Sequence, residues 1–282
     1  MKKTLFKHSA VFLAGLWFSA AQAYEVEVVE IPSQSMAKAH KATLVLPDSY
    51  KDSTKSYPVL YLLHGHGGDY KNWAERTEVE ALADKHQMLI VMPDGNINSW
   101  YVDSSFKPNS NYQRYIGEEI PAYLDSHYRT LAQRSGRAIT GLSMGGFGAL
   151  NIALAYPTQF IAAGSTSGGV DPRGFEGKWG LNEVFGDPLV HQDVWMQKAI
   201  INRIDGFKQH NLALIVDCGV EDFFVAANRR LHQALLDKGI AHTYIEQPGG
   251  HNWPYWAASI GLQAEFLSRY FAVSDSPKNP AP

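Results

Sequence analysis

A serine lies between two glycines in the sequence Gly141-Leu142-Ser143-Met144-Gly145, which follows a short apolar run and precedes an Ala/Leu-rich helical segment. This G-x-S-x-G spacing is typical of a strand-to-helix turn so sharp that the serine backbone is strained. Side chains at positions 141 and 145 would collide with neighbouring backbone, and the two glycines remove those collisions. The turn points the hydroxyl into solvent and leaves the Met144 amide at a helix start, where the dipole favours a developing oxyanion. The motif predicts Ser143 as a nucleophile; a Gly-rich turn without chemistry is the alternative.

Apolar runs and helical patterns alternate along the chain. Nearly continuous apolar runs, typical of strands buried on both faces of a parallel sheet, cover 58–63, 88–92, 137–141, 160–165 and 212–216. Further strands are expected at 24–30, 42–46 and 242–246, the first two as an antiparallel edge. Helical patterns cover 79–87, 112–128, 146–156, 228–238 and 257–271. This order predicts an α/β fold with right-handed crossovers and a mostly parallel central sheet that carries helices on both faces.

A serine hydroxyl is a weak nucleophile, so Ser143 requires a base and an orienting acid, which follow in the order Ser, Asp/Glu, His. His251 lies in a Gly-rich loop before the last predicted helix and is the candidate base. Three acids follow the preceding apolar run. We favour Asp222, which lies in a turn before aromatic residues that would bury it, and keep Glu221 and Asp217 as alternatives.

The Gly-rich loop after the third predicted strand is expected to supply an amide to the oxyanion hole, together with the amide of Met144. The favoured donor is the amide of His66, with that of Gly67 as the alternative. A metal site at His64, His66 and Asp69 is disfavoured because further ligands cannot be placed. A phosphate cradle is excluded because no Lys-Ser/Thr pair follows the glycines. The sequence predicts neither a metal nor a cofactor.

Composition excludes several classes of protein. The chain has 282 residues, a formal charge of -3 and no run of Lys or Arg, so nucleic acid is a poor candidate partner. Its single cysteine, Cys218, excludes an intrachain disulfide and a multi-thiolate metal site. Residues 24–273 are expected to form one catalytic domain, followed by a flexible polar tail over 274–282.

The first 23 residues have the pattern of a cleaved secretory signal. Three lysines precede an apolar run over 10–20, and Ala21-Gln22-Ala23 supplies the small-x-small pattern of a cleavage site. The run is shorter than the roughly 20 residues that a membrane-spanning helix needs, so an anchor or a buried helix is the disfavoured alternative. We therefore expect an exported protein, periplasmic or secreted, without stable membrane insertion.

Five segments together resemble the putative esterase family of α/β-hydrolases, which includes tributyrin esterases, S-formylglutathione hydrolase (esterase D), feruloyl and acetyl-xylan esterases and the antigen 85 mycolyltransferases. They are LLHGHGG (62–68), MPDGNINSWYVDS (92–104), GLSMGGFGAL (141–150), CGVEDFF (218–224) and GGHNWPYW (249–256). The resemblance implies an α/β-hydrolase fold with Ser143 as nucleophile, Asp222 as acid and His251 as base. It also implies the amides of His66 and Met144 as oxyanion donors. The chain looks closest to the tributyrin-esterase-like members.

These features predict an exported serine carboxylic ester hydrolase that acts on a small-molecule ester, short-acyl or carbohydrate-linked, through an acyl-enzyme. The alternatives are an acyltransferase with the same triad, a thioesterase similar to S-formylglutathione hydrolase, and a catalytically silent binding protein. Trp100, Tyr101 and Trp253 are candidate walls of the substrate site, with ordinary aromatic packing as the alternative. The Gly- and Pro-rich segment 168–195 is expected to cover the carboxyl ends of the strands, where it could act as a lid.

Overall fold

The computed structural model describes residues 24–271, which form one sheet covered by helices. The predicted signal over 1–23 and the tail over 274–282 lie outside the described residues. None of the helices within 24–271 combines the length and the apolar composition needed to cross a membrane.

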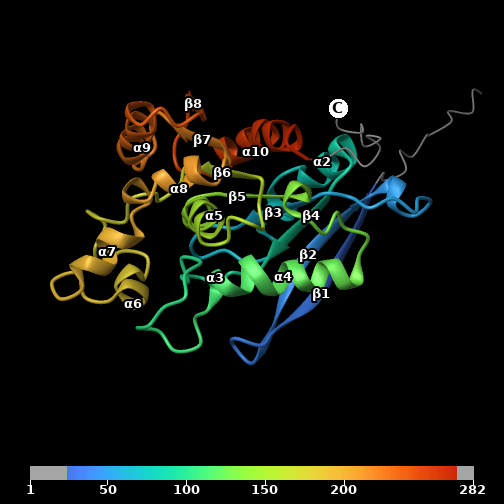
Figure 1. The fold of residues 1–282 in the computed structure, drawn as a ribbon, viewed down its shortest axis with the longest axis horizontal. Coiled ribbons are helices and arrows are strands. Elements are labelled where there is room, and N and C mark those ends of the chain that lie inside the picture. Colours follow the sequence, from blue (N-terminus) through green and yellow to red (C-terminus); the bar gives the residue numbers. More distant parts are fainter. Residues whose placement is uncertain (1–23, 272–282) are drawn as a thin grey trace, which may run out of the picture.

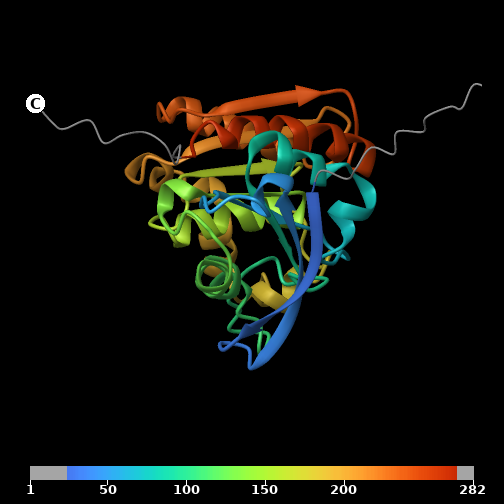
Figure 2. The same ribbon diagram turned by 90° about the vertical axis from the view of Figure 1, so that its right-hand side faces the viewer.

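Within these residues the sheet has eight strands in the order β1-β2-β4-β3-β5-β6-β7-β8 (Figure 1). They are β1 (Tyr24–Ser33), β2 (Lys38–Pro47), β3 (Val59–Leu63), β4 (Leu89–Pro93), β5 (Arg137–Gly141), β6 (Ala162–Thr166), β7 (Ala213–Gly219) and β8 (Thr243–Gln247). The pairs β1/β2 and β2/β4 are antiparallel and all others are parallel, as the sequence predicts. The sheet twists strongly, so that β1 and β8 at its two edges cross at a steep angle (Figure 2).

Helices cover both faces of the sheet. They are α1 (Asn72–Arg76), α2 (Val79–His86), α3 (Tyr112–Arg114), α4 (Ile120–His127), α5 (Met144–Ala155), α6 (Leu181–Phe185), α7 (Gln192–Lys198), α8 (Asp205–Gln209), α9 (Val225–Asp237) and α10 (Trp253–Ser268). Helices α2 and α10 pack on one face and contribute to one apolar core, whereas α4, α5 and α9 contribute to the other. The predicted α/β-hydrolase architecture is therefore confirmed.

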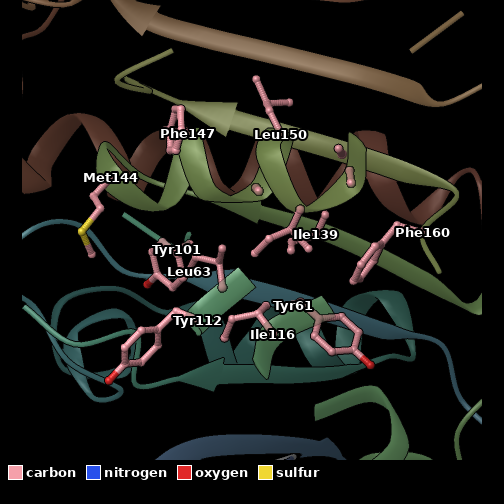
Figure 3. Close-up of a cluster of buried hydrophobic side chains, with 14 of the residues drawn as sticks. Tyr61, Leu63, Tyr101, Tyr112, Ile116, Ile139, Met144, Phe147, Leu150 and Phe160 are labelled. Carbon is pink, nitrogen blue, oxygen red and sulfur yellow. The ribbon is translucent and has the colours of Figure 1, made fainter. Parts of the chain in front are cut away.

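Strand β3 shows why its sequence is continuously apolar. Leu60 and Leu62 point into the core below α2 and α10, whereas Tyr61 and Leu63 point into the core below α5. Successive strand side chains face opposite sides, so a strand covered on both faces needs apolar residues at every position. Figure 3 shows Tyr61 in the α5 core, where its ring meets the edge of Phe160 at 5.3 Å between ring centroids.

The segment predicted as one helix over 112–128 is interrupted. Helix α3 is followed by one wide π-helical turn, Tyr115–Glu119, before α4 begins at Ile120. Pro121 has no amide hydrogen, and its ring would clash with the carbonyl of Gly117 in a regular α-helix. A π-type turn relieves such a clash by shifting the hydrogen-bond pattern by one residue.

The segment over 168–195 also differs from the prediction, which assigned it no helices. It contains α6 and most of α7, and Leu181, Phe185 and Trp195 are buried in the core on the α5 side. Phe185 packs against Phe147 of α5 with ring centroids 6.1 Å apart. The insertion is thus a packed part of the domain, held by apolar residues whose spacing is too irregular for a sequence pattern to reveal.

Candidate active site

Ser143 lies in the turn between β5 and α5 with φ of 56° and ψ of -115°, a strained conformation for a residue with a side chain. A Cβ atom at Gly141 would lie 2.7 Å from the carbonyl oxygen of Leu63, and one at Gly145 would lie 2.5 Å from the same oxygen. Both distances are shorter than any real contact allows. The predicted reason for the two glycines is confirmed, and it explains how the turn brings Ser143 to the carboxyl end of the sheet.

Three side chains from three separate loops form a hydrogen-bonded chain. The Ser143 hydroxyl lies 2.9 Å from Nε2 of His251, and Nδ1 of His251 lies 2.8 Å from Oδ2 of Asp222. The Asp222 carboxylate is fully buried, and its other oxygen accepts the amide of Phe224 at 2.8 Å. With Nδ1–H donating to the carboxylate, Nε2 is left as the acceptor that faces the hydroxyl, which is the tautomer a general base requires.

The structure distinguishes between the three acids that the sequence left open. The Glu221 side chain is exposed, and no hydrogen bond among residues 24–271 joins it to His251. Asp217 is buried and accepts hydrogen bonds from four side chains, those of Thr166, Tyr255, Ser259 and Gln263. Burial raises the pKa of Asp217, and these donors oppose the shift by favouring the carboxylate. Asp217 therefore ties β7 to β6 and α10, while Asp222 orients the histidine.

Two backbone amides are available as oxyanion donors. Met144 is the first residue of α5, so its amide has no acceptor within the helix. The amide of Gly67 donates to the carbonyl of Ile97 at 2.7 Å, whereas no hydrogen bond among the described residues uses the amide of His66. The geometry favours the His66 amide over that of Gly67.

His64, a member of the disfavoured metal alternative, has a structural role. It is buried, its Nδ1 donates to the carbonyl of Gly65 at 2.8 Å, and its Nε2 accepts the amide of Gly95 at 2.8 Å. Burial lowers its pKa, which keeps the ring neutral. Because both ring nitrogens are used, His64 anchors the oxyanion loop and has no lone pair left for a metal ion.

A cavity of about 410 Å³ opens at Ser143 and His251. Its aromatic walls come from four different segments of the chain: Trp100, Trp179, Phe223, Trp253 and Trp256. A site of this volume with aromatic walls and a few polar groups is suited to a small molecule. The structure places Trp100 and Trp253 at the cavity, where the sequence analysis expected them.

Tyr101 is not at the cavity, and the prediction that it forms a wall is wrong. Its side chain is fully buried, and its hydroxyl donates to the carbonyl of His64 at 3.1 Å. The ring lies against the backbone of Gly95 and Gly148, where a Cβ atom would approach it to 2.2 Å and 2.5 Å. Trp100 and Tyr101 both have positive φ, and this turn directs the two neighbouring rings to different surroundings.

Several residues at the cavity were not found from the sequence: Asn72, Arg76, Trp179, Phe223 and Trp256. Phe223 could have been found, because it directly follows the orienting acid and packs on the His251 ring at 4.2 Å. Trp179 could not, since it comes from the insertion and reaches the site by stacking on Phe223 at 5.5 Å.

The insertion is fastened beside the cavity by polar contacts. The indole of Trp100 donates to the carbonyl of Trp179 at 3.0 Å. Glu183 of α6 accepts from Asn98 and Lys107, each at 2.9 Å. These contacts join the insertion to the loop after β4, so the segment expected as a cover forms one wall of the site.

A family model and three known proteins that are similar to this chain are all described as esterases. The family model described as "Putative esterase" matches residues 33–264. An esterase of Mycobacterium tuberculosis is 32% identical over 74% of this chain, which spans only 51% of that relative. An acetyl esterase of Caldicellulosiruptor saccharolyticus is 29% identical over 79% of this chain and 86% of its own length. The solved structure of a ferulic acid esterase is 27% identical and superimposes with a TM-score of 0.77, covering 88% of this chain and 99% of that one.

Proposed function

The chain belongs to the "Putative esterase" family, and from this premise and the geometry of its site we propose that it hydrolyses carboxylic esters through an acyl-enzyme on Ser143. The observation that carries the proposal is the continuous hydrogen-bonded chain from Ser143 through His251 to the buried Asp222 at the mouth of a small cavity. The chain spans about half of the length of the mycobacterial esterase that it matches. The proposed activity therefore rests on the residues of this chain.

In the first half of the reaction, the Ser143 oxygen attacks the ester carbonyl carbon while Nε2 of His251 takes the hydroxyl proton. The carbonyl oxygen gains negative charge and is stabilised by the amides of His66 and Met144. The bond to the leaving alcohol then breaks, and His251 gives its proton to that alkoxide. Asp222 stabilises the charged imidazole throughout, and the product is an acyl group on Ser143.

In the second half, a water molecule takes the place of the alcohol. His251 removes its proton as the water oxygen attacks the acyl carbonyl, and the same amides stabilise the second oxyanion. The bond to Ser143 breaks, the serine oxygen regains a proton from His251, and the free acid leaves. If an alcohol enters instead of water, the same site transfers the acyl group to that alcohol. An acyltransferase reaction therefore differs from ester hydrolysis only in the molecule that accepts the acyl group.

We propose that the substrate is an ester with a short acyl group or an ester linked to a carbohydrate. The walls contributed by Trp179, Phe223 and Trp253, whose side chains are exposed or half-buried, offer flat surfaces for a sugar or aromatic ring. The names of two relatives, acetyl esterase and ferulic acid esterase, support small and aromatic acyl groups. The cavity is also lined by His66, Gly67, Gly68 and Asn72, and its volume of about 410 Å³ limits the length of the acyl chain that it can hold.

The test is a series of p-nitrophenyl esters. We expect kcat/KM to be highest for acetate and butyrate and to fall for octanoate, because a cavity of about 410 Å³ leaves a long acyl chain little room beside the leaving group. The absorbance of released p-nitrophenolate at about 400 nm measures each rate, and a protein-free blank gives the background rate. Hydrolysis no faster than the blank would contradict the proposal. Acyl transfer that exceeds acid release when glucose is added would favour the acyltransferase.

We also propose that the enzyme acts outside the cytoplasm, on the strength of the signal pattern over 1–23. Expression in a bacterial host is expected to release a chain that begins at Tyr24, because Ala21-Gln22-Ala23 fits the small-residue preference of signal peptidase. Intact-mass measurement of protein from the periplasm or medium checks the cleavage position. A cytoplasmic chain that keeps Met1 would contradict this part of the proposal, and Ala23→Asp is the control that should block cleavage.

A further inference from the structure

Arg76, the last residue of α1, lines the cavity beside the proposed catalytic residues. Its side chain is exposed, and its guanidinium carbon lies over the Trp253 ring at 5.4 Å from the centroid. None of the ion pairs among residues 24–271 involves Arg76, although Glu75 and Glu78 are close in sequence. Arg76 is thus a cation at the site whose guanidinium makes no hydrogen bond or ion pair with any residue that the structure describes.

A series of aromatic contacts holds Arg76 in this position. The indole of Trp73, also in α1, donates to the carbonyl of Leu63 at 3.1 Å and fixes the helix at the end of β3. The Trp73 ring meets the edge of Trp253 at 5.4 Å, and Trp253 meets Trp256 at 5.3 Å. Stacking on an aromatic face leaves the guanidinium N–H groups at its edge free to bind an oxyanion with two parallel hydrogen bonds.

The charges around the cavity favour an anion. Among the described residues that line it, none is Asp or Glu, and Arg76 carries the only permanent charge. The Asp222 carboxylate is fully buried and is already bonded to His251. Glu183, whose charge acts on the cavity residue His66, is paired with Lys107 at 2.9 Å. A ligand carboxylate at the Arg76 end would meet this cation in a cavity that no described carboxylate lines.

We propose that Arg76 selects esters that carry an anionic oxygen group, such as a carboxylate, on the part of the molecule that lies against α1. This inference rests on the proposed ester hydrolysis and names the class of its substrate. The charge can belong to the acyl part or to the alcohol part of the ester, because both parts are attached to the carbonyl carbon that Ser143 attacks and both lie in the cavity. Arginine suits this role because its planar fork matches the two oxygens of a carboxylate.

Two matched substrate pairs test the proposal, one for each part of the ester. Mono(p-nitrophenyl) adipate and p-nitrophenyl hexanoate differ in the charge of the acyl part, and p-acetoxybenzoate and p-acetoxybenzamide differ in the charge of the alcohol part. For at least one pair, Arg76→Gln is expected to lower the ratio of kcat/KM for the anionic over the neutral ester about tenfold, mostly through KM. Added salt should reduce the wild-type ratio, since the arginine is exposed.

Lys71→Gln is the matched control, because Lys71 is an exposed cation immediately before α1 that does not line the cavity. It removes the same charge and should leave both ratios within about twofold. The proposal is overturned if Arg76→Gln leaves both ratios unchanged. It is also overturned if Lys71→Gln reproduces the effect, since the cause would then be the overall charge of the surface.

A binding measurement separates this proposal from the proposed catalysis. In the Ser143→Ala variant, titration with monomethyl adipate is expected to change tryptophan fluorescence through Trp253, and methyl hexanoate should bind about tenfold more weakly. Adding Arg76→Gln should remove the difference. If p-nitrophenyl esters are not hydrolysed but this difference is found, the catalytic proposal fails and the anion site stands. Equal binding of both ligands overturns the anion site alone.

Discussion

Replacement of Ser143 by alanine is expected to lower kcat for p-nitrophenyl butyrate by roughly four to six orders of magnitude, the range found when a serine hydrolase loses its nucleophile. Among residues 24–271, the Ser143 hydroxyl is the only group hydrogen-bonded to Nε2 of His251, at 2.9 Å. The residual rate would come from the oxyanion amides and from substrate binding. Steady-state kinetics on the purified variant, with circular dichroism to establish its fold, is the measurement.

Ser126→Ala is a suitable control for this variant. Ser126 is exposed on α4, and within the described part of the chain its hydroxyl bonds only to the carbonyl of Tyr123 and to His127. The control should keep the wild-type rate. If the Ser143 variant retains more than about a hundredth of the wild-type kcat while folded, Ser143 is not the nucleophile and the proposed function fails.

Replacement of Asp222 by asparagine is expected to lower kcat by about 10⁴-fold, the size of effect known for the equivalent change in a serine protease. The Asp222 carboxylate holds Nδ1 of His251 at 2.8 Å and is fully buried. An amide in its place can donate to the histidine, which favours the tautomer whose Nε2 carries a proton and cannot accept the serine proton. The same kinetic assay checks this, and the melting temperature should change little because the two side chains have nearly the same shape.

The two neighbouring acids provide controls with different expected results. Glu221→Gln changes an exposed side chain and should leave kcat within about twofold. Asp217→Asn should instead lower the unfolding free energy by about 1 to 3 kcal/mol. Its amide nitrogen would replace one carboxylate oxygen and place hydrogens against the two donors that bond to that oxygen. Loss of activity in folded Glu221→Gln, with activity kept in Asp222→Asn, would reverse the assignment.

Much of the fold could be predicted because it is encoded in short segments. All eight strands found in residues 24–271 overlap runs of apolar or alternating residues that the sequence shows directly. The expected antiparallel edge and the helices on both faces are also present. The predictions were incomplete where the pattern is not local. The first such place is the π-helical turn before Pro121. The second is the insertion over 168–195, whose helices of 5 and 7 residues are each shorter than two full turns.

At the site, the order of residues carried more information than their composition. Ser143, Asp222 and His251 are 79 and 29 residues apart in the chain, yet each follows a strand whose carboxyl end meets the others at one edge of the sheet. A parallel sheet makes that convergence predictable from the order of elements. Tyr101 shows where such reasoning stops, because a single turn decides whether an aromatic ring faces the cavity or the core.

The sequence by itself determined the nucleophile turn, the candidate base and the architecture, because each depends on residues within a few positions of one another or on their order. The tertiary structure decided which of three acids meets His251. Within residues 24–271 it also decided which amide of the oxyanion loop is unpaired and that Arg76 lies at the cavity without an ion pair. These facts depend on contacts between segments that are distant in the chain. Such contacts are set by packing of the whole domain, and no local pattern records them.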